Sequence, residues 1–231
     1  MPFYYHYDPT YLLLIPAFLL SLFAQWYVNS TYKKYANVPT MGGRTAAQVA
    51  RDILDQNGLS NVRIEQVRGH LTDHYDPKAH ILRLSDGVYG STNVSALGIA
   101  AHEAGHALQH GMGYGFLKLR NAFLPIVQIA SYAAIPLLIL GLLLEAFMLV
   151  DIAILLYVAV VVFYLITLPV EYNASSRAIA ILDGGGYLDA GEMAGAKKVL
   201  HAAAFTYVAN ALMAILQLLR LVLIAGNRRR D

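Results

Sequence analysis

The sequence predicts an α-helical membrane protein with about four hydrophobic helices and a small α+β domain. Two observations support this fold class. Only 14% of the 231 residues are charged and 57% are hydrophobic, whereas soluble domains carry about 25% charged residues. The apolar residues also gather in long runs, and they leave residues 29–121 as ordinary globular sequence. A membrane-embedded chain with one polar domain is therefore expected.

Four apolar runs are each long enough, or nearly so, to cross a bilayer as a helix, which takes about 20 residues. The first lacks a basic leader and a cleavage site, so we expect an anchor and not a signal peptide. The fourth contains Asn210, Gln217 and Arg220, and a buried soluble helix is its alternative interpretation. The runs cover residues 11–28, 122–144, 152–170 and 202–225.

The distribution of lysine and arginine predicts how the chain is oriented, because these residues favour the cytoplasmic side. They lie just after the first run, just before the second and between the third and fourth. This places residues 29–122 and 171–201 inside. The basic tail, residues 227–230, does not fit, because four crossings would place it outside. Either the fourth run bends back into the membrane or the rule fails there.

The polar segment has helix and strand signals in alternation. Thr45 and Gln48 form a capping-box pattern at the start of an amphipathic stretch. Alternating apolar and polar residues predict two short strands. Ser91, Thr92 and Asn93 offer N-caps for a further helix, which Gly111 and Gly113 would end. The expected elements are helices over 46–57 and 94–110 and strands over 62–67 and 80–85.

The second of these helices carries the pattern HExxH in Ala101-His102-Glu103-Ala104-Gly105-His106. Residues four apart share a helix face, so His102 and His106 can bind one metal ion. Glu103 lies about 100° around the helix, where it can accept a proton from a zinc-bound water. Since the chain has no cysteine, histidine and carboxylate are its available strong ligands. One catalytic Zn²⁺ is expected.

A catalytic zinc needs a third protein ligand, and Glu171 is the preferred candidate. It follows the third apolar run, where the hairpin of runs two and three returns the chain to the side of His102. A solvated carboxylate at a helix end is the alternative interpretation. Other candidates on the inner side are His70, His74, His80, His110, His201 and Glu65.

Two further roles are predicted with alternatives left open. Charge developing on the attacked carbonyl oxygen needs a partner, for which Tyr207, His201 and Arg177 are candidates. Their alternatives are an interfacial tyrosine, a surface histidine and a pair with a lipid phosphate. The strand over 80–85 precedes the metal helix, and we expect it to be an edge strand that pairs with an extended peptide. An internal strand is the alternative.

The segments AHEAGHALQ, EYNASSRAI, DHYDP and LRLS resemble the putative neutral zinc metallopeptidase family of bacterial membrane proteins, the YugP-like proteins. The chain is more distantly similar to the HtpX-like and CAAX prenyl proteases. The resemblance implies that His102, His106 and Glu171 bind zinc and that Glu103 is the base. It also implies acidic residues near Glu171 where this chain has Asn173 and Ser175. The groups that orient the histidines therefore remain open.

The expected function is a membrane-integral zinc endopeptidase of the bacterial cytoplasmic membrane, with its active site on the cytoplasmic side. Substrates would be membrane proteins or peptides, and a net charge of +2 gives no reason to expect nucleic acid. A non-proteolytic scaffold or quality-control adaptor and a zinc amidase acting on small molecules or lipids are the alternatives. The oligomeric state is unknown. The expected division is an anchor (1–28), a zincin-like catalytic domain (29–121), a transmembrane hairpin (122–170), a third-ligand segment (171–201) and a hydrophobic helix with a basic tail (202–231).

Overall fold

The computed structural model describes residues 9–228, and it confirms the predicted fold class. The chain is mostly helical, with four long apolar helices and a small three-stranded mixed sheet. Each long helix lies in a segment that is long and apolar enough to cross a membrane. A short 3₁₀ helix, η1 (Pro9–Leu14), precedes the helices α1 (Ile15–Ala36), α2 (Ala46–Gln56), α3 (Val94–Gly111), α4 (Gly115–Leu143), α5 (Phe147–Gly184) and α6 (Ala190–Arg228). The strands are β1 (Arg63–Val67), β2 (His74–Asp76) and β3 (Ile81–Ser85).

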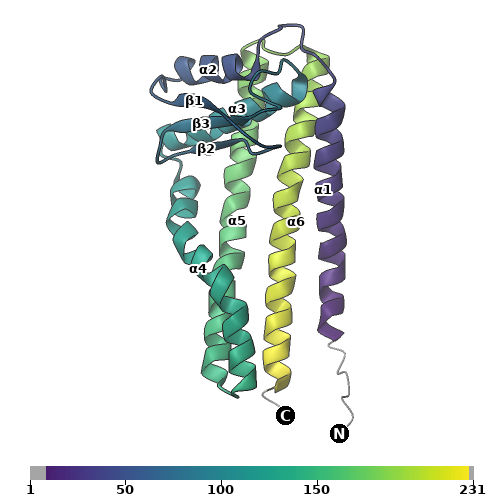
Figure 1. Ribbon diagram of the computed structural model, residues 1–231, viewed down its shortest axis with the longest axis vertical. Helices are drawn as coiled ribbons and strands as arrows, with labels where there is room; N and C mark the ends of the chain where they lie inside the picture. The colour runs from purple at the N-terminus through teal and green to yellow at the C-terminus, as the bar shows by residue number, and fades with distance from the viewer. Residues whose placement is uncertain (1–8, 229–231) are drawn as a thin grey trace.

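The long helices run along one axis, and the polar domain lies at one end of them (Figure 1). α2, α3 and the sheet form this end, whereas the α4–α5 turn lies at the opposite end, where α1 begins and α6 finishes. α6 is a single helix from Ala190 to Arg228, so the fourth apolar run does not bend back. Arg229 and Arg230 of the basic tail lie outside the described residues.

The predicted helix starts of the polar domain are present. The Thr45 side chain accepts from the Gln48 backbone, and the Gln48 side chain accepts from the Thr45 backbone, as a capping box requires. Asn93, one of three N-cap candidates, caps α3 by accepting from the Ala96 N–H. These caps hold α2 and α3 at defined starting points in the domain.

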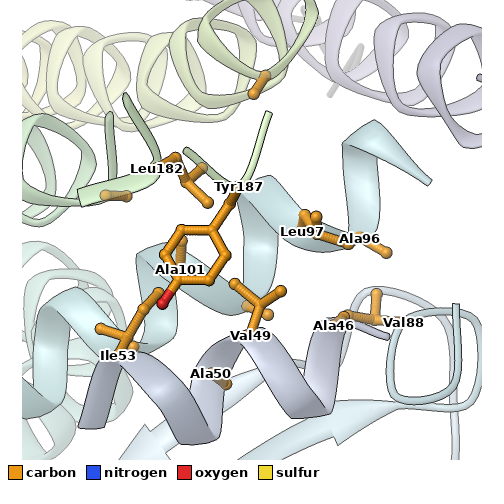
Figure 2. Packing of buried hydrophobic residues seen from close by; sticks show 14 of the residues in the cluster. Ala46, Val49, Ala50, Ile53, Val88, Ala96, Leu97, Ala101, Leu182 and Tyr187 are labelled. Carbon is orange, nitrogen blue, oxygen red and sulfur yellow. The ribbon is translucent and has the colours of Figure 1, made fainter. Parts of the chain in front are cut away.

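The core of the polar domain also includes the ends of α5 and α6. Val49 and Ile53 of α2 point toward Ala101 of α3, with Leu182 of α5 and Tyr187 beside them (Figure 2). These side chains are buried, with Tyr187 the most exposed of the five at 8%. α5 therefore continues past the apolar run and is built into the domain that carries α3.

The strand order is β1-β3-β2, with β1 parallel and β2 antiparallel to β3. Leu82 of β3 is paired with Ile64 on one side and with Tyr75 on the other. The expectation that the strand over 80–85 is an edge strand was therefore wrong. β2 was not predicted, and it covers the edge that β3 would otherwise present.

Candidate metal centre

The two histidines of the HExxH pattern lie one turn apart on α3. Their rings meet edge to face, with centroids 4.7 Å apart. Their side chains are nearly buried, being 13% and 12% exposed for His102 and His106. The helix thus presents two imidazole nitrogens at one point on its α5 side.

Glu171 reaches this point from α5 because α3 and α5 approach each other closely. A Cβ atom added to Gly105 would lie 2.8 Å from the backbone oxygen of Ala174, a distance that only glycine allows. The Glu171 carboxylate Oε2 lies 3.3 Å from His102 Nε2 and 3.5 Å from His106 Nε2. Glu171 is 2% exposed, so a solvated helix-end role does not describe it.

These three side chains form a geometry that fits zinc. Their ligand atoms all lie within 4.8 Å of one another, and no other such group occurs within residues 9–228. Tetrahedral zinc ligands with bonds of about 2.1 Å lie about 3.4 Å apart, close to the 3.3 and 3.5 Å that separate Glu171 from the histidines. Two imidazoles and a carboxylate are also a ligand set used by catalytic zinc.

The charge of the site also favours a cation. Burial by itself lowers the pKa of His106, but the adjacent Glu171 carboxylate, with a contribution from Glu103, raises that pKa overall. A negative potential that stabilises a protonated imidazole stabilises a divalent ion in the same place. Metal binding would require His106 to be neutral.

Neutral side chains orient both histidines. Ser175 Oγ lies 3.1 Å from His102 Nδ1, and Gln109 Oε1 lies 3.0 Å from His106 Nδ1. A hydrogen bond at Nδ1 fixes the ring so that Nε2 faces the metal. Residue 175 is a serine and not an acid, but it still supplies a hydrogen-bond partner for His102.

Gln109 links α3 to α5 and was missed in the sequence. Its side chain is fully buried and donates to the Val170 carbonyl oxygen at 2.7 Å and to Asn173 Oδ1 at 3.0 Å. Arg177 Nε donates to the same Asn173 oxygen at 2.8 Å. Asn173 therefore acts on His106 through Gln109. An amide on an apolar helix face, three residues after His106, was the available signal.

Arg120 is a second residue that the sequence analysis missed. Its Nη1 lies 3.7 Å from Glu171 Oε1, the oxygen turned away from the histidines. Tyr207 of α6 lies beside Glu171 and faces the open space around the cluster, whereas His201 is exposed and lines neither hollow described below. The structure thus brings Tyr207, but not His201, to the predicted ligands.

The remaining candidates for the third ligand have other neighbours. His70 packs edge to face on Tyr32, and the His74 ring bonds to the Thr72 carbonyl oxygen. His80 and His110 lie ring to ring, with centroids 5.3 Å apart. Glu65 pairs with arginines of the sheet.

Two hollows flank the cluster. The larger, about 770 Å³, is bordered by β2 and its flanking residues on one side and by α4 on the other. The smaller, about 320 Å³, lies toward α1 and α6. Both are lined by Asp73, Glu103, Glu171 and Tyr207. Open space therefore extends to both sides of the ligands, and Glu103, which is 9% exposed, faces it.

Comparison with known proteins agrees with this geometry. The family described as "Putative neutral zinc metallopeptidase" matches residues 10–226. The chain is 50% identical over 220 residues to the "Putative membrane protease YugP" of Bacillus subtilis (strain 168), a match that covers 95% of this chain and 97% of the relative. No solved structure matches the chain. With a family match over nearly its whole length, the chain belongs to the neutral zinc metallopeptidase family and is a membrane zinc metallopeptidase.

Proposed function

We propose that this metallopeptidase is an endopeptidase that cleaves membrane proteins or membrane-bound peptides at the cytoplasmic face. One observation carries the proposal: the open space continues on both sides of the cluster and is bordered by the edge strand β2. A bond in the middle of a chain can lie at such a site, because neither side is closed. An exopeptidase needs one closed side.

His102, His106 and Glu171 would hold the zinc ion. When bound, zinc lowers the pKa of water toward about 7 and polarises a carbonyl group. Glu103 is the proton carrier: it takes a proton from the attacking water and gives it to the leaving amine. Its position next to His102 and at the junction of both hollows supports this role.

The negative charge on the attacked oxygen needs a donor that faces the hollow. Tyr207 and Arg120 both line the larger hollow beside Glu171. Tyr207 has a hydroxyl for this purpose, and Arg120 has a guanidinium that is 31% exposed. His201 has no place in this scheme because its side chain lies elsewhere on α6.

Strand β2 would hold the substrate backbone. It pairs with β3 along one edge only, and its residues His74, Tyr75 and Asp76 line the larger hollow together with Glu103 and His106. An extended peptide can add to such an edge by backbone hydrogen bonds. This favours peptides over the small amides that an amidase would use.

Two observations support the membrane substrate class and the cytoplasmic side. Glu171 and Tyr207 lie on helices long and apolar enough to span the bilayer. Lys33, Lys34 and Lys118 flank the polar domain, which favours the cytoplasmic side. A cysteine introduced by Ser60→Cys in the exposed α2–β1 turn, in a chain without cysteine, should label only from inside the cell.

Glu103→Gln in the purified, zinc-loaded protein tests the endopeptidase. We expect peptide cleavage to fall by about 10²- to 10⁴-fold with zinc content unchanged. Glu65→Gln, on the exposed face of the sheet, is the matched control and should cleave normally. Full activity of the Glu103→Gln variant would refute the role of Glu103. Wild-type protein that hydrolyses a small amide but no peptide of ten residues or more would favour the amidase.

A further inference from the structure

One face of α4 forms a wall of the larger hollow. The lining residues recur every three or four positions, as the face of one helix requires. They are Leu117, Arg120, Asn121, Leu124, Pro125 and Gln128. Arg120 lies at the level of the cluster, since it pairs with Glu171. Gln128 is eight residues further along the helix, about 12 Å away at 1.5 Å per residue.

This wall ends where α4 meets α5. Val127 and Ala130 of α4 pack with Val160 of α5 in one buried cluster, and Gly141 lies against Val150 further on. In Figure 1 the part of α4 near the polar domain stands apart from α5, and the lower part lies against it. Pro125 lies inside α4 two residues before Val127, where it removes a backbone hydrogen bond. The lining of the hollow therefore extends from the cluster along the apolar part of α4 as far as Gln128.

Two amide side chains face this extension. Asn121 and Gln128 are exposed, and neither makes a side-chain hydrogen bond within residues 9–228. Gln128 lies inside an apolar run, where an unpaired amide is costly in contact with lipid. Polar residues at such a position usually line a path for a polar ligand. An unfolded peptide backbone offers the donors and acceptors that two amides can pair with.

We propose that this face of α4, from Leu117 to Gln128, receives the membrane-embedded segment of the substrate next to the scissile bond. The segment is unwound there, and the side-chain amides of Asn121 and Gln128 form hydrogen bonds with its backbone. From Gln128 the segment continues along α4 to the metal ligands. The proposal rests on the proposed endopeptidase function and adds that the substrate enters sideways from the bilayer. The continuity of the hollow with the edge of β2 selects a peptide over a lipid chain, which has no backbone groups to pair.

A kinetic comparison tests the amides. The probes are a quenched-fluorescent decapeptide that the wild type cleaves and the same sequence joined to a 20-residue Leu-Ala membrane segment, in liposomes. We expect the double variant Asn121→Leu/Gln128→Leu to lose about tenfold in kcat/KM on the membrane probe, because two hydrogen bonds to the substrate backbone are lost. It should retain wild-type cleavage of the free decapeptide. Ser131→Leu, an exposed polar residue of α4 outside the wall, is the control.

Each outcome separates this proposal from the proposed function. Equal losses on both probes would show that the amides serve the site itself, and no loss on either would remove them from substrate binding; both overturn the proposal. If Glu103→Gln leaves cleavage of both probes intact, the proposed function fails instead.

A cross-linking experiment gives a readout that does not depend on activity. In the inactive Glu103→Gln protein, Gln128→Cys is compared with Ile129→Cys, which lies at the same depth and is 67% exposed on another face. The probe is the membrane peptide with one cysteine at the end of its Leu-Ala segment. We expect at least tenfold more disulfide with Gln128→Cys. Equal cross-linking indicates unspecific contact in the bilayer and overturns the proposal. If a membrane-impermeant maleimide labels Gln128→Cys but the peptide does not cross-link to it, the groove holds water and no substrate segment. This outcome also overturns the proposal.

Discussion

The residues on the two sides of the metal centre are positioned in different ways. On the α3 side, His102, Glu103 and His106 are set by the geometry of a single helix. On the α5 side, Glu171 is placed by a close helix contact and by hydrogen bonds that cross between helices. In the proposed mechanism the α3 side supplies the proton carrier and two ligands, and Glu171 on the α5 side supplies the third ligand. A change of Glu103 should therefore affect the chemistry first, whereas changes that displace Glu171 or the groups that hold it should affect metal affinity first.

The largest expected effect is the loss of the α5 ligand. Glu171→Ala should lower zinc affinity by more than about 100-fold, because loss of an indirect partner alone costs 10- to 100-fold. Zinc content after dialysis against a chelator measures this. Glu145→Gln, in the exposed turn between α4 and α5, should keep its zinc. Retention of zinc by Glu171→Ala would assign the third ligand to another residue.

The next largest expected effect is on stability, and it concerns the contact between α3 and α5 at Gly105. Gly105→Ala should cost about 1–3 kcal/mol of stability and weaken zinc binding, because the added methyl group meets the Ala174 backbone. Gly98→Ala on the same helix is the matched control, since its Cβ would be 3.7 Å from Ala196 Cβ, an ordinary contact. Thermal unfolding of the two variants with and without zinc should separate them. If both are tolerated equally, close packing at Gly105 does not position Glu171.

A smaller difference is expected between the two orienting groups. Gln109→Ala should lower zinc affinity more than Ser175→Ala, within the 10- to 100-fold range for such partners. Gln109 is fully buried and also bonds to α5, whereas for Ser175 the orienting contact is the one to His102. Competition titration with a zinc-binding dye gives the order, and the reverse order would contradict it.

The smallest expected effect is on the pH dependence of stability, and it concerns the contact between α3 and strand β2. Burial lowers the pKa of His110, as do His80 and Lys118, so the neutral ring that bonds to the Tyr75 hydroxyl at 2.9 Å is favoured. The unfolded chain binds this proton more readily. The neutral His110 ring therefore contributes fully to folding stability at pH values above the ordinary histidine pKa of about 6.5. This contribution falls as the pH drops toward the lowered pKa of His110.

His110→Gln should therefore reduce the loss of stability between about pH 7 and pH 5. Thermal unfolding midpoints at both pH values test this. His201→Gln, on an exposed part of α6, is the control variant. An unchanged dependence in His110→Gln would assign the acid sensitivity to other groups.

The same contrast explains which parts could be predicted from the sequence. The starts of α2 and α3 and the HExxH geometry depend on residues a few positions apart, so Thr45, Asn93 and His102 could be recognised directly. The edge strand was assigned to the wrong segment because strand order is set by tertiary pairing. β2, at three residues, is too short to show alternation. Gln109 and Arg120 act across helices, and no local pattern predicts which partner they meet.

The position of Glu171 has a consequence for biosynthesis. A ribosome that has completed the polar domain has made both histidines and the base but not the third ligand, which follows α4 and most of the apolar part of α5. Closure of the ligand set therefore has to wait until that hairpin has been synthesised and has settled against α3. Until then the chain holds only two of the three residues of the cluster, so we expect no zinc-dependent cleavage before the hairpin is in place.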